Sequence, residues 1–177
     1  MSINNILFQS LVVLLRVLLG VGWCLAGITK ITGKTGEVSW YGHPTVFLTD
    51  YLTKALDKPN VPGFYKSFIH EVALNHVPFL NYTIPITQII MGICLIIGIM
   101  TFPAIFICLF MHINFILSGN MNLLSLTLYT SVFGLLLCRR DAFILSLDRY
   151  FNIENLFKLK KPDYLRWNET EETLLSK

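Results

Sequence analysis

Charged side chains are scarce in this sequence. Only 14% of its 177 residues are Asp, Glu, Lys or Arg, whereas a soluble domain carries about 25%. From Val72 to Cys138 there is no charged residue at all. The core of an aqueous domain of this size needs no such uncharged run. The composition therefore predicts a protein that crosses a membrane several times.

Several other features are missing as well. The four cysteines lie in apolar runs and form no CxxC pair, which favours packing over a disulfide framework or a zinc site. The net charge of +3 is mild and the basic residues do not alternate with aromatic ones along a stripe, so we expect no nucleic-acid partner. The amino-terminal apolar stretch lacks the basic residues that open a signal peptide. We expect it to remain as a spanning helix.

Four apolar segments predict an all-α transmembrane four-helix bundle. The spans are placed at about residues 6–28, 82–100, 104–117 and 123–138. At about 1.5 Å per residue, the first is long enough to cross a hydrocarbon core of about 30 Å. The last two are short, so their flanking turns should lie at headgroup depth. A tight turn is predicted at Thr101–Pro103, because proline lacks the N–H that a helix interior needs.

The first outer loop, residues 29–81, is too polar to span a membrane and too apolar to be a linker. It predicts two short amphipathic helices that lie on the bilayer surface and cap the bundle, the second beginning near Pro62. Their apolar positions are Phe47, Leu48, Tyr51, Leu52 and Ala55 in the first helix, and Phe64, Tyr65, Phe68, Ile69, Val72 and Ala73 in the second.

The chain turns polar after Arg139–Arg140. One more amphipathic helix is predicted at about residues 142–157, so residues 1–150 form the membrane domain and residues 151–177 a polar tail. An even number of spans places both termini on one side of the membrane. The arginine pair at the end of the last span favours the cytoplasmic side of the plasma membrane.

Arg16 is the one charged residue deep inside a predicted span. A charge at the centre of a spanning helix costs about 2.5–3.5 kcal/mol on insertion scales. The spans contain no acidic residue, so we expect its partners to be backbone carbonyls, Gln88, Tyr129, an asparagine, water or a ligand. Two interpretations stay open: an arginine that bridges helices, and an arginine that binds a substrate.

Other polar side chains gather in the outer half of the predicted bundle. Hydrogen bonds between membrane helices average only about 0.6 kcal/mol, so a binding pocket is favoured over polar residues that serve packing alone. The imidazole of His112 titrates near neutral pH and is a candidate proton carrier, although a neutral histidine bonded across helices fits equally. The other polar residues of this half are Lys30, Gln88, Asn114, Asn120 and Asn122.

A metal or haem site is not expected. Three histidines lie in the outer loop, but His70 and His76 are six positions apart and would fall on different helix faces.

Four stretches in order resemble the DoxX/DoxD family of small four-span membrane proteins. The first is RVLLGVGWCLAGITK, with Arg16, Gly20, Gly27 and Lys30 at the spacing of the family's opening helix. The others are QIIMGICLIIG from position 88, HINFILSGNMN from position 112, and the closing Arg…Leu-Asp-Arg segment at positions 139–149. Position 88 is glutamine where the family commonly has an acidic residue, and Cys138 stands where a glycine often occurs.

The resemblance implies a membrane subunit of an oxidoreductase, similar to the small subunits of thiosulfate:quinone oxidoreductase. It implies a bound quinone or small redox substrate, such as a sulfur oxyanion, and a partner protein chain or a homo-oligomer. In that interpretation His112 is the catalytic proton carrier, and the binding residues are Arg16, Lys30, Gln88, Asn114 and Asn122. One alternative is a non-enzymatic anchoring or assembly subunit, and another is a small-solute carrier.

Overall fold

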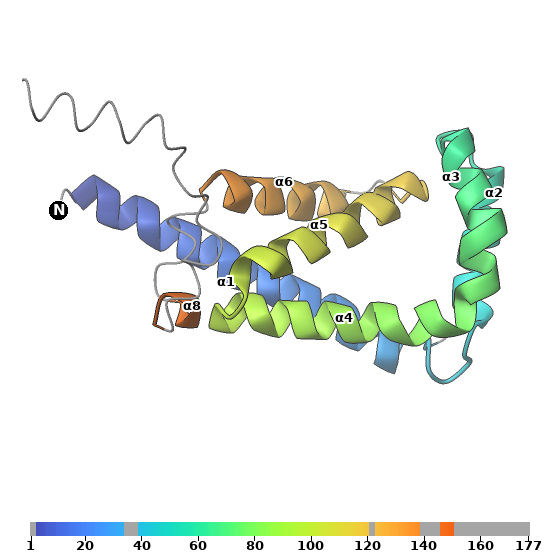
Figure 1. Ribbon diagram of the computed structural model, residues 1–177, viewed down its shortest axis with the longest axis horizontal. Helices are drawn as coiled ribbons and strands as arrows, with labels where there is room; N and C mark the ends of the chain where they lie inside the picture. Colours follow the sequence, from blue (N-terminus) through green and yellow to red (C-terminus); the bar gives the residue numbers. More distant parts are fainter. Residues whose placement is uncertain (1–2, 34–38, 121–122, 139–145, 151–177) are drawn as a thin grey trace, which may run out of the picture.

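The computed structural model describes residues 3–33, 39–120, 123–138 and 146–150, and every element in these ranges is helical (Figure 1). The helices are α1 (Ile3–Thr32), α2 (Val46–Asp57), α3 (Gly63–Phe68), α4 (Val77–Ile97), α5 (Thr101–Leu117), α6 (Leu123–Leu137) and α8 (Leu147–Tyr150). A π-helical turn, Ile69–Ala73, and a 3-10 turn, Leu74–His76, connect α3 to α4. The predicted all-α class is confirmed for the described residues. Most of the predicted helix at 142–157, and the tail from 151 onward, lie outside them.

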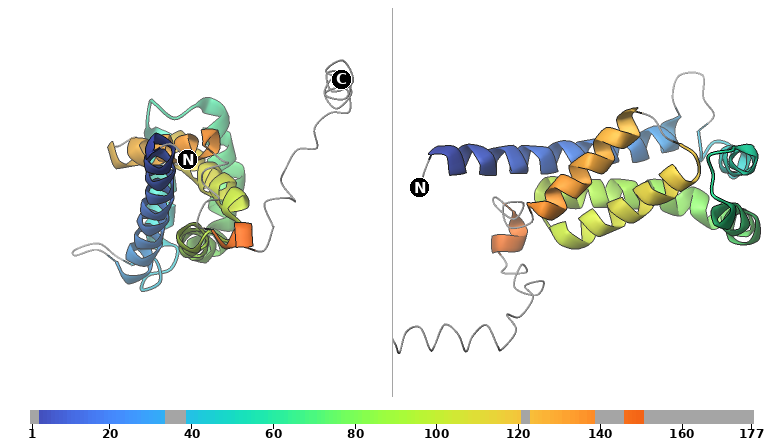
Figure 2. Two further views of the ribbon diagram at one scale, coloured as in Figure 1. Left: turned by 90° about the vertical axis from the view of Figure 1, so that its left-hand side faces the viewer. Right: turned by 90° about the horizontal axis from the view of Figure 1, so that it is seen from above.

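Four helices, α1, α4, α5 and α6, run alongside one another and form what we call the bundle (Figures 1 and 2). The closest pair is α1 and α4. A Cβ added at Gly92 of α4 would lie 2.5 Å from Cys24 Sγ and 2.6 Å from the Gly20 carbonyl oxygen. The two backbones approach this closely only because both positions are glycine. The buried core between the helices contains Val12, Leu19, Trp23, Leu95, Ala104, Ile105, Cys108, Val132 and Leu135.

The turn between α4 and α5 lies earlier than the sequence predicted. Gly98 ends α4 with φ 77° and Met100 follows with φ 48°. Thr101 then begins α5, so the prediction of a turn at Thr101–Pro103 was wrong. Pro103 lies in the first turn of α5, where a missing N–H breaks no helical hydrogen bond. We call this end of the bundle, which also holds α8 and the start of α1, the turn end (Figure 1).

At the opposite end of the bundle, α2 and α3 lie across the helices; we call this the cap end (Figures 1 and 2). The predicted amphipathic helix in the first half of the loop is confirmed, because α2 buries Leu48, Leu52 and Ala55. Only half of the second predicted apolar stripe is buried. Its members Tyr65, Ile69 and Ala73 are buried, whereas Phe64, Phe68 and Val72 are exposed.

Two helical segments of the described chain are long and apolar enough to cross a membrane, Ile6–Thr32 and Gly63–Ile97. Only 33% and 28% of their most apolar windows are buried inside the protein. The core helix of a soluble protein would be mostly buried. The exposed large apolar residues of α1 are Ile6, Leu7, Phe8, Leu11, Leu14, Leu18, Val21, Leu25 and Ile28, and those of α4 include Ile86, Ile90, Ile93 and Ile97.

Candidate functional site

The structure separates the predicted site residues into three groups. Gln88 and His112 are buried within the bundle, Lys30 and Asn114 lie at the cap end, and Arg16 reaches the turn end. Asn122 lies outside the described residues. The predicted outer-half cluster is therefore brought together in part, and Arg16 does not belong to it.

His112 packs against Trp23, a residue of α1 that was not predicted to belong to the site. The rings of Trp23 and His112 pack edge to face, with centroids 6.3 Å apart and planes at 72°. One helical turn further along α1, a Cβ added at Gly27 would lie 3.2 Å from Gln88 Cβ. Thus α1, α4 and α5 each contribute one residue to this group, and all three side chains are at most 2% exposed.

Two polar atoms of this group have no hydrogen-bond partner among the described residues. They are the acceptor Gln88 Oε1 and the donor Trp23 Nε1. A buried polar group without a partner costs about 1–3 kcal/mol, and such groups in native proteins call for an explanation such as a water or a ligand. Together with His112, which packs on Trp23, these two residues supply a donor, an acceptor and an imidazole to one stretch of the bundle. We call Trp23, Gln88 and His112 the central polar group.

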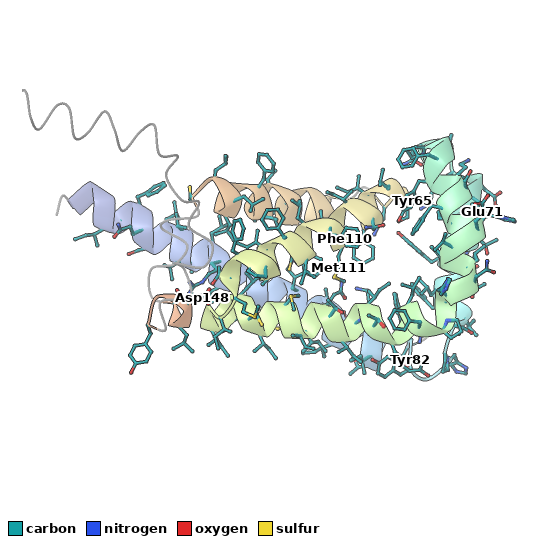
Figure 3. All side chains as sticks on the ribbon, viewed as in Figure 1. Tyr65, Glu71, Tyr82, Phe110, Met111 and Asp148 are labelled. Carbon is teal, nitrogen blue, oxygen red and sulfur yellow. The ribbon has the colours of Figure 1, made fainter. Side chains whose placement is uncertain are left out.

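Asn114 uses its polar atoms to connect the cap to the bundle. Its Oδ1 accepts a 3.0 Å hydrogen bond from the Tyr65 hydroxyl, and its Nδ2 donates to the Phe110 carbonyl at 2.8 Å. Figure 3 shows Tyr65 on the side of α3 that faces α5. A second connection joins α2 to the end of α5, where the Tyr51 and Ser118 hydroxyls lie 2.5 Å apart. Burial raises the pKa of the Tyr51 phenol, so this hydroxyl stays protonated.

Lys30 ends α1 under the cap. Its Nζ donates to the Ala26 carbonyl at 3.2 Å and lies 5.7 Å from the Trp40 ring centroid and 5.6 Å from that of Phe115. Cation–π contacts of this kind hold an ammonium group at a partly buried position. Lys30 therefore places a positive charge between the central polar group and the cap.

Arg16 and the acidic residue Asp148 of α8 both lie at the turn between α4 and α5. The carboxylate interacts electrostatically with the guanidinium, and both side chains are only 1% exposed. A Cβ added at Gly98 would lie 3.0 Å from Arg16 Nη1, which places the guanidinium against the turn between α4 and α5. Asp148 is not among the partners expected for Arg16, because that expectation considered only residues inside the predicted spans. Asp148 comes after α6 in the chain and packs at the turn between α4 and α5.

Asp148 also holds the turn itself. Its Oδ1 accepts from the Met100 N–H at 2.6 Å and its Oδ2 from the Thr101 N–H at 2.7 Å, while its own N–H donates to the Gly98 carbonyl at 3.0 Å. These N–H groups open α5, and an acidic side chain there satisfies donors that have no partner within the helix. The Leu-Asp-Arg segment in the family resemblance was the one sequence signal for this residue. Figure 3 shows Asp148 at the turn end.

The two buried polar regions are too far apart to form one site. Arg16 and Gly27, which packs on Gln88, are separated by three turns of α1, or about 16 Å at 1.5 Å per residue. In the described part of the chain, no three His, Cys, Asp or Glu side chains converge in a way that would hold a metal ion. The central polar group has the donor and the acceptor needed to bind a small ligand through hydrogen bonds, and it lacks a set of metal ligands.

No protein-family model, no curated protein and no solved structure matches the chain significantly.

Proposed function

We propose that this protein is an integral membrane subunit of an oxidoreductase, similar to the DoxX/DoxD family, that binds quinone or a small redox substrate at the central polar group. The observation that carries the proposal is that two buried hydrogen-bonding atoms, Gln88 Oε1 and Trp23 Nε1, have no partner among the described residues, while His112 packs on Trp23. A bare core of hydrophobic residues would be more stable than one that leaves these atoms without partners.

The proposal includes four membrane spans, α1, α4, α5 and α6. Exposed apolar side chains support four spans, because they occur on α5 and α6 as well as on α1 and α4. Phe106 and Phe110 of α5 are 48% and 69% exposed, and Phe133 and Leu137 of α6 are 49% and 75% exposed. Large apolar side chains on the outside of every bundle helix suit a hydrocarbon surrounding better than water.

Each residue of the proposed site has a separate role. Trp23 donates to an oxygen of the ligand, and Gln88 accepts from a hydroxyl or N–H group of the ligand. His112 takes up or releases one of the two protons that accompany the two-electron interconversion of quinone and quinol, with the electrons exchanged with the partner chain of the oxidoreductase. Gln88 cannot fill this role because its amide does not titrate. Lys30 supplies positive charge on the cap side, which favours a ligand with carbonyl or anionic oxygens. Arg16 stabilises the fold through Asp148 instead of binding substrate.

Quinone binding tests the proposal directly. The purified protein in nanodiscs is titrated with a short-chain benzoquinone and a short-chain naphthoquinone, each in oxidised and reduced form, by calorimetry. The loss of one hydrogen bond, about 1.4 kcal/mol, should weaken binding about tenfold in Gln88→Leu and in Trp23→Phe.

Thr101→Val is the matched control for these variants. Thr101 is also buried and its Oγ1 also has no partner among the described residues, but it lies at the turn end. The Thr101→Val variant should bind quinone as tightly as the unmodified protein does. Absence of binding in the unmodified protein, or an equal loss in Thr101→Val, would contradict the proposal.

One alternative is favoured by specific contacts. Two of the predicted binding residues hold the structure together: Asn114 bonds to Tyr65, and Arg16 interacts electrostatically with Asp148. If the central polar group has the same purpose, the protein is a non-enzymatic anchoring or assembly subunit. In that case no quinone or sulfur oxyanion binds, and the protein is recovered from its native membrane with a partner chain whose association survives Gln88→Leu.

A further inference from the structure

Three exposed apolar side chains lie on one side of the cap. Phe64, Phe68 and Val72 are 68%, 41% and 44% exposed, and we call them the cap stripe. They recur every fourth residue, the spacing that aligns side chains along one side of a helix. Their neighbours Tyr65 and Ile69 are buried against the bundle. The segment therefore has an apolar side in addition to the side that it packs on the protein.

The rest of this segment is polar. Its other exposed residues between Gly63 and His76 are Ser67, His70, Glu71, Asn75 and His76. A segment with one buried, one exposed apolar and one exposed polar side is typical of a helix that lies at a boundary between water and an apolar phase. A cap surrounded only by water gains nothing from two outward phenylalanines.

The direction of α3 fits such a boundary. The segment stands across the end of α4 (Figures 1 and 2). Pro78 lies in the first turn of α4 and provides no N–H to continue a straight helix from the preceding segment, and the π and 3-10 turns lie at the same bend. When α4 crosses the bilayer, α3 lies parallel to the membrane plane.

The cap stripe is also continuous with the apolar side of α4. The exposed apolar positions of the segment Gly63–Ile97 follow one another at intervals of three, four or seven residues, through the bend and along α4. They are Phe64, Phe68, Val72, Phe79, Tyr82, Ile86, Ile90, Ile93 and Ile97. We propose that the cap stripe binds the lipid surface, with both phenylalanines in the boundary between headgroups and acyl chains. This inference rests on the membrane insertion in the proposed function.

A second protein molecule is a poorer occupant of this surface. A phenylalanine buries about 150–250 Å², so the exposed parts of the three side chains amount to roughly 300 Å². Each partner in a stable protein interface buries about 800 Å². Lipid needs no such minimum area, because each apolar side chain partitions into the boundary on its own.

The lipid contact would hold the cap in place over the bundle. Phe64 and Phe68 flank Tyr65, whose hydroxyl donates to Asn114. The same turns of helix therefore attach to α5 on one side and to lipid on another. A change in the lipids of the bilayer should therefore alter the cap before it alters the bundle.

Photo-crosslinking tests the inference. The amino acid p-benzoylphenylalanine is incorporated singly at position 64, 68, 71 or 90, and each protein is reconstituted in phosphatidylcholine vesicles and irradiated. Position 71 is the polar control on the same segment, since Glu71 is exposed. Position 90 is the control for insertion, since Ile90 faces outward from α4. Mass spectrometry should find lipid adducts at 64, 68 and 90, with yields about tenfold above that at 71.

The controls separate the two proposals. Lipid adducts at 90, with none above the level of 71 at 64 and 68, would overturn the cap-stripe inference and leave the membrane spans intact. Adducts at 64 or 68 to a second copy of the chain would overturn it as well and identify the stripe as a dimer contact. Lack of lipid adducts at 90 would contradict the proposed insertion itself, and the inference with it.

Discussion

The interaction between Arg16 and Asp148 gives the sharpest prediction. Asp148→Ala removes the carboxylate that accepts two N–H groups, from Met100 and Thr101, and also removes a buried negative charge that interacts electrostatically with the Arg16 guanidinium. Removal of one partner from a buried ion pair costs about 3–5 kcal/mol. For a chain of this length, 1 kcal/mol changes Tm by about 2–4 °C, so Tm should fall by roughly 6–20 °C.

The assay is thermal unfolding in one detergent, followed by circular dichroism and by fluorescence to check that both probes report one transition. The chain offers an exposed ion pair as the control. Lys54 Nζ and Asp50 Oδ2 are 2.6 Å apart, and the side chains are 71% and 57% exposed. An exposed pair on one helix contributes about 0.3–0.5 kcal/mol. Asp50→Ala should therefore change Tm by only about 1–2 °C.

A double-mutant cycle separates the charge interaction from the hydrogen bonds. Arg16→Met alone should destabilise the protein, because Asp148 then keeps a buried charge without its cation. The cycle uses Arg16→Met, Asp148→Asn and the double variant. The free energy of unfolding lost in the double variant should be about 1–3 kcal/mol smaller than the sum of the losses in the two single variants. The reasoning is refuted if the two changes are additive, or if Asp148→Ala shifts Tm no more than Asp50→Ala does.

Three further substitutions follow from close contacts. Gly92→Ala would place a Cβ 2.5 Å from a sulfur and 2.6 Å from a backbone oxygen of α1, and should destabilise by about 1–3 kcal/mol, whereas Gly63→Ala, with nothing within 4 Å of the added atom, should be close to neutral. Tyr65→Phe removes the hydroxyl that donates to Asn114 and should lower stability by about 1 kcal/mol in denaturant titrations. Trp23→Phe removes a buried donor without a partner but leaves a small cavity in the core, so the ligand-free protein should lose less than about 2 kcal/mol of stability; a larger loss would show that the indole N–H is satisfied.

Elements of this fold with a strong local pattern could be predicted from the sequence. The helices α1, α5 and α6 lie within a few residues of the predicted spans, because a long apolar run with few breaks is a strong local signal for a helix. In α2, the i, i+4 pattern also indicated which side is buried. The turn after α4 was misplaced because proline was taken to end a helix, and here it lies in the first turn of one.

The sequence by itself determined the helical class, and it indicated that Gln88, His112 and Arg16 are buried, since these polar residues stand inside long apolar runs. Only the tertiary structure decided which of these residues meet. It brought Trp23 to His112, joined Arg16 to Asp148, and left Phe64 outside while it buried Tyr65. These contacts join residues far apart in the chain, or depend on which side of a helix the rest of the protein covers. Local periodicity carries neither kind of information.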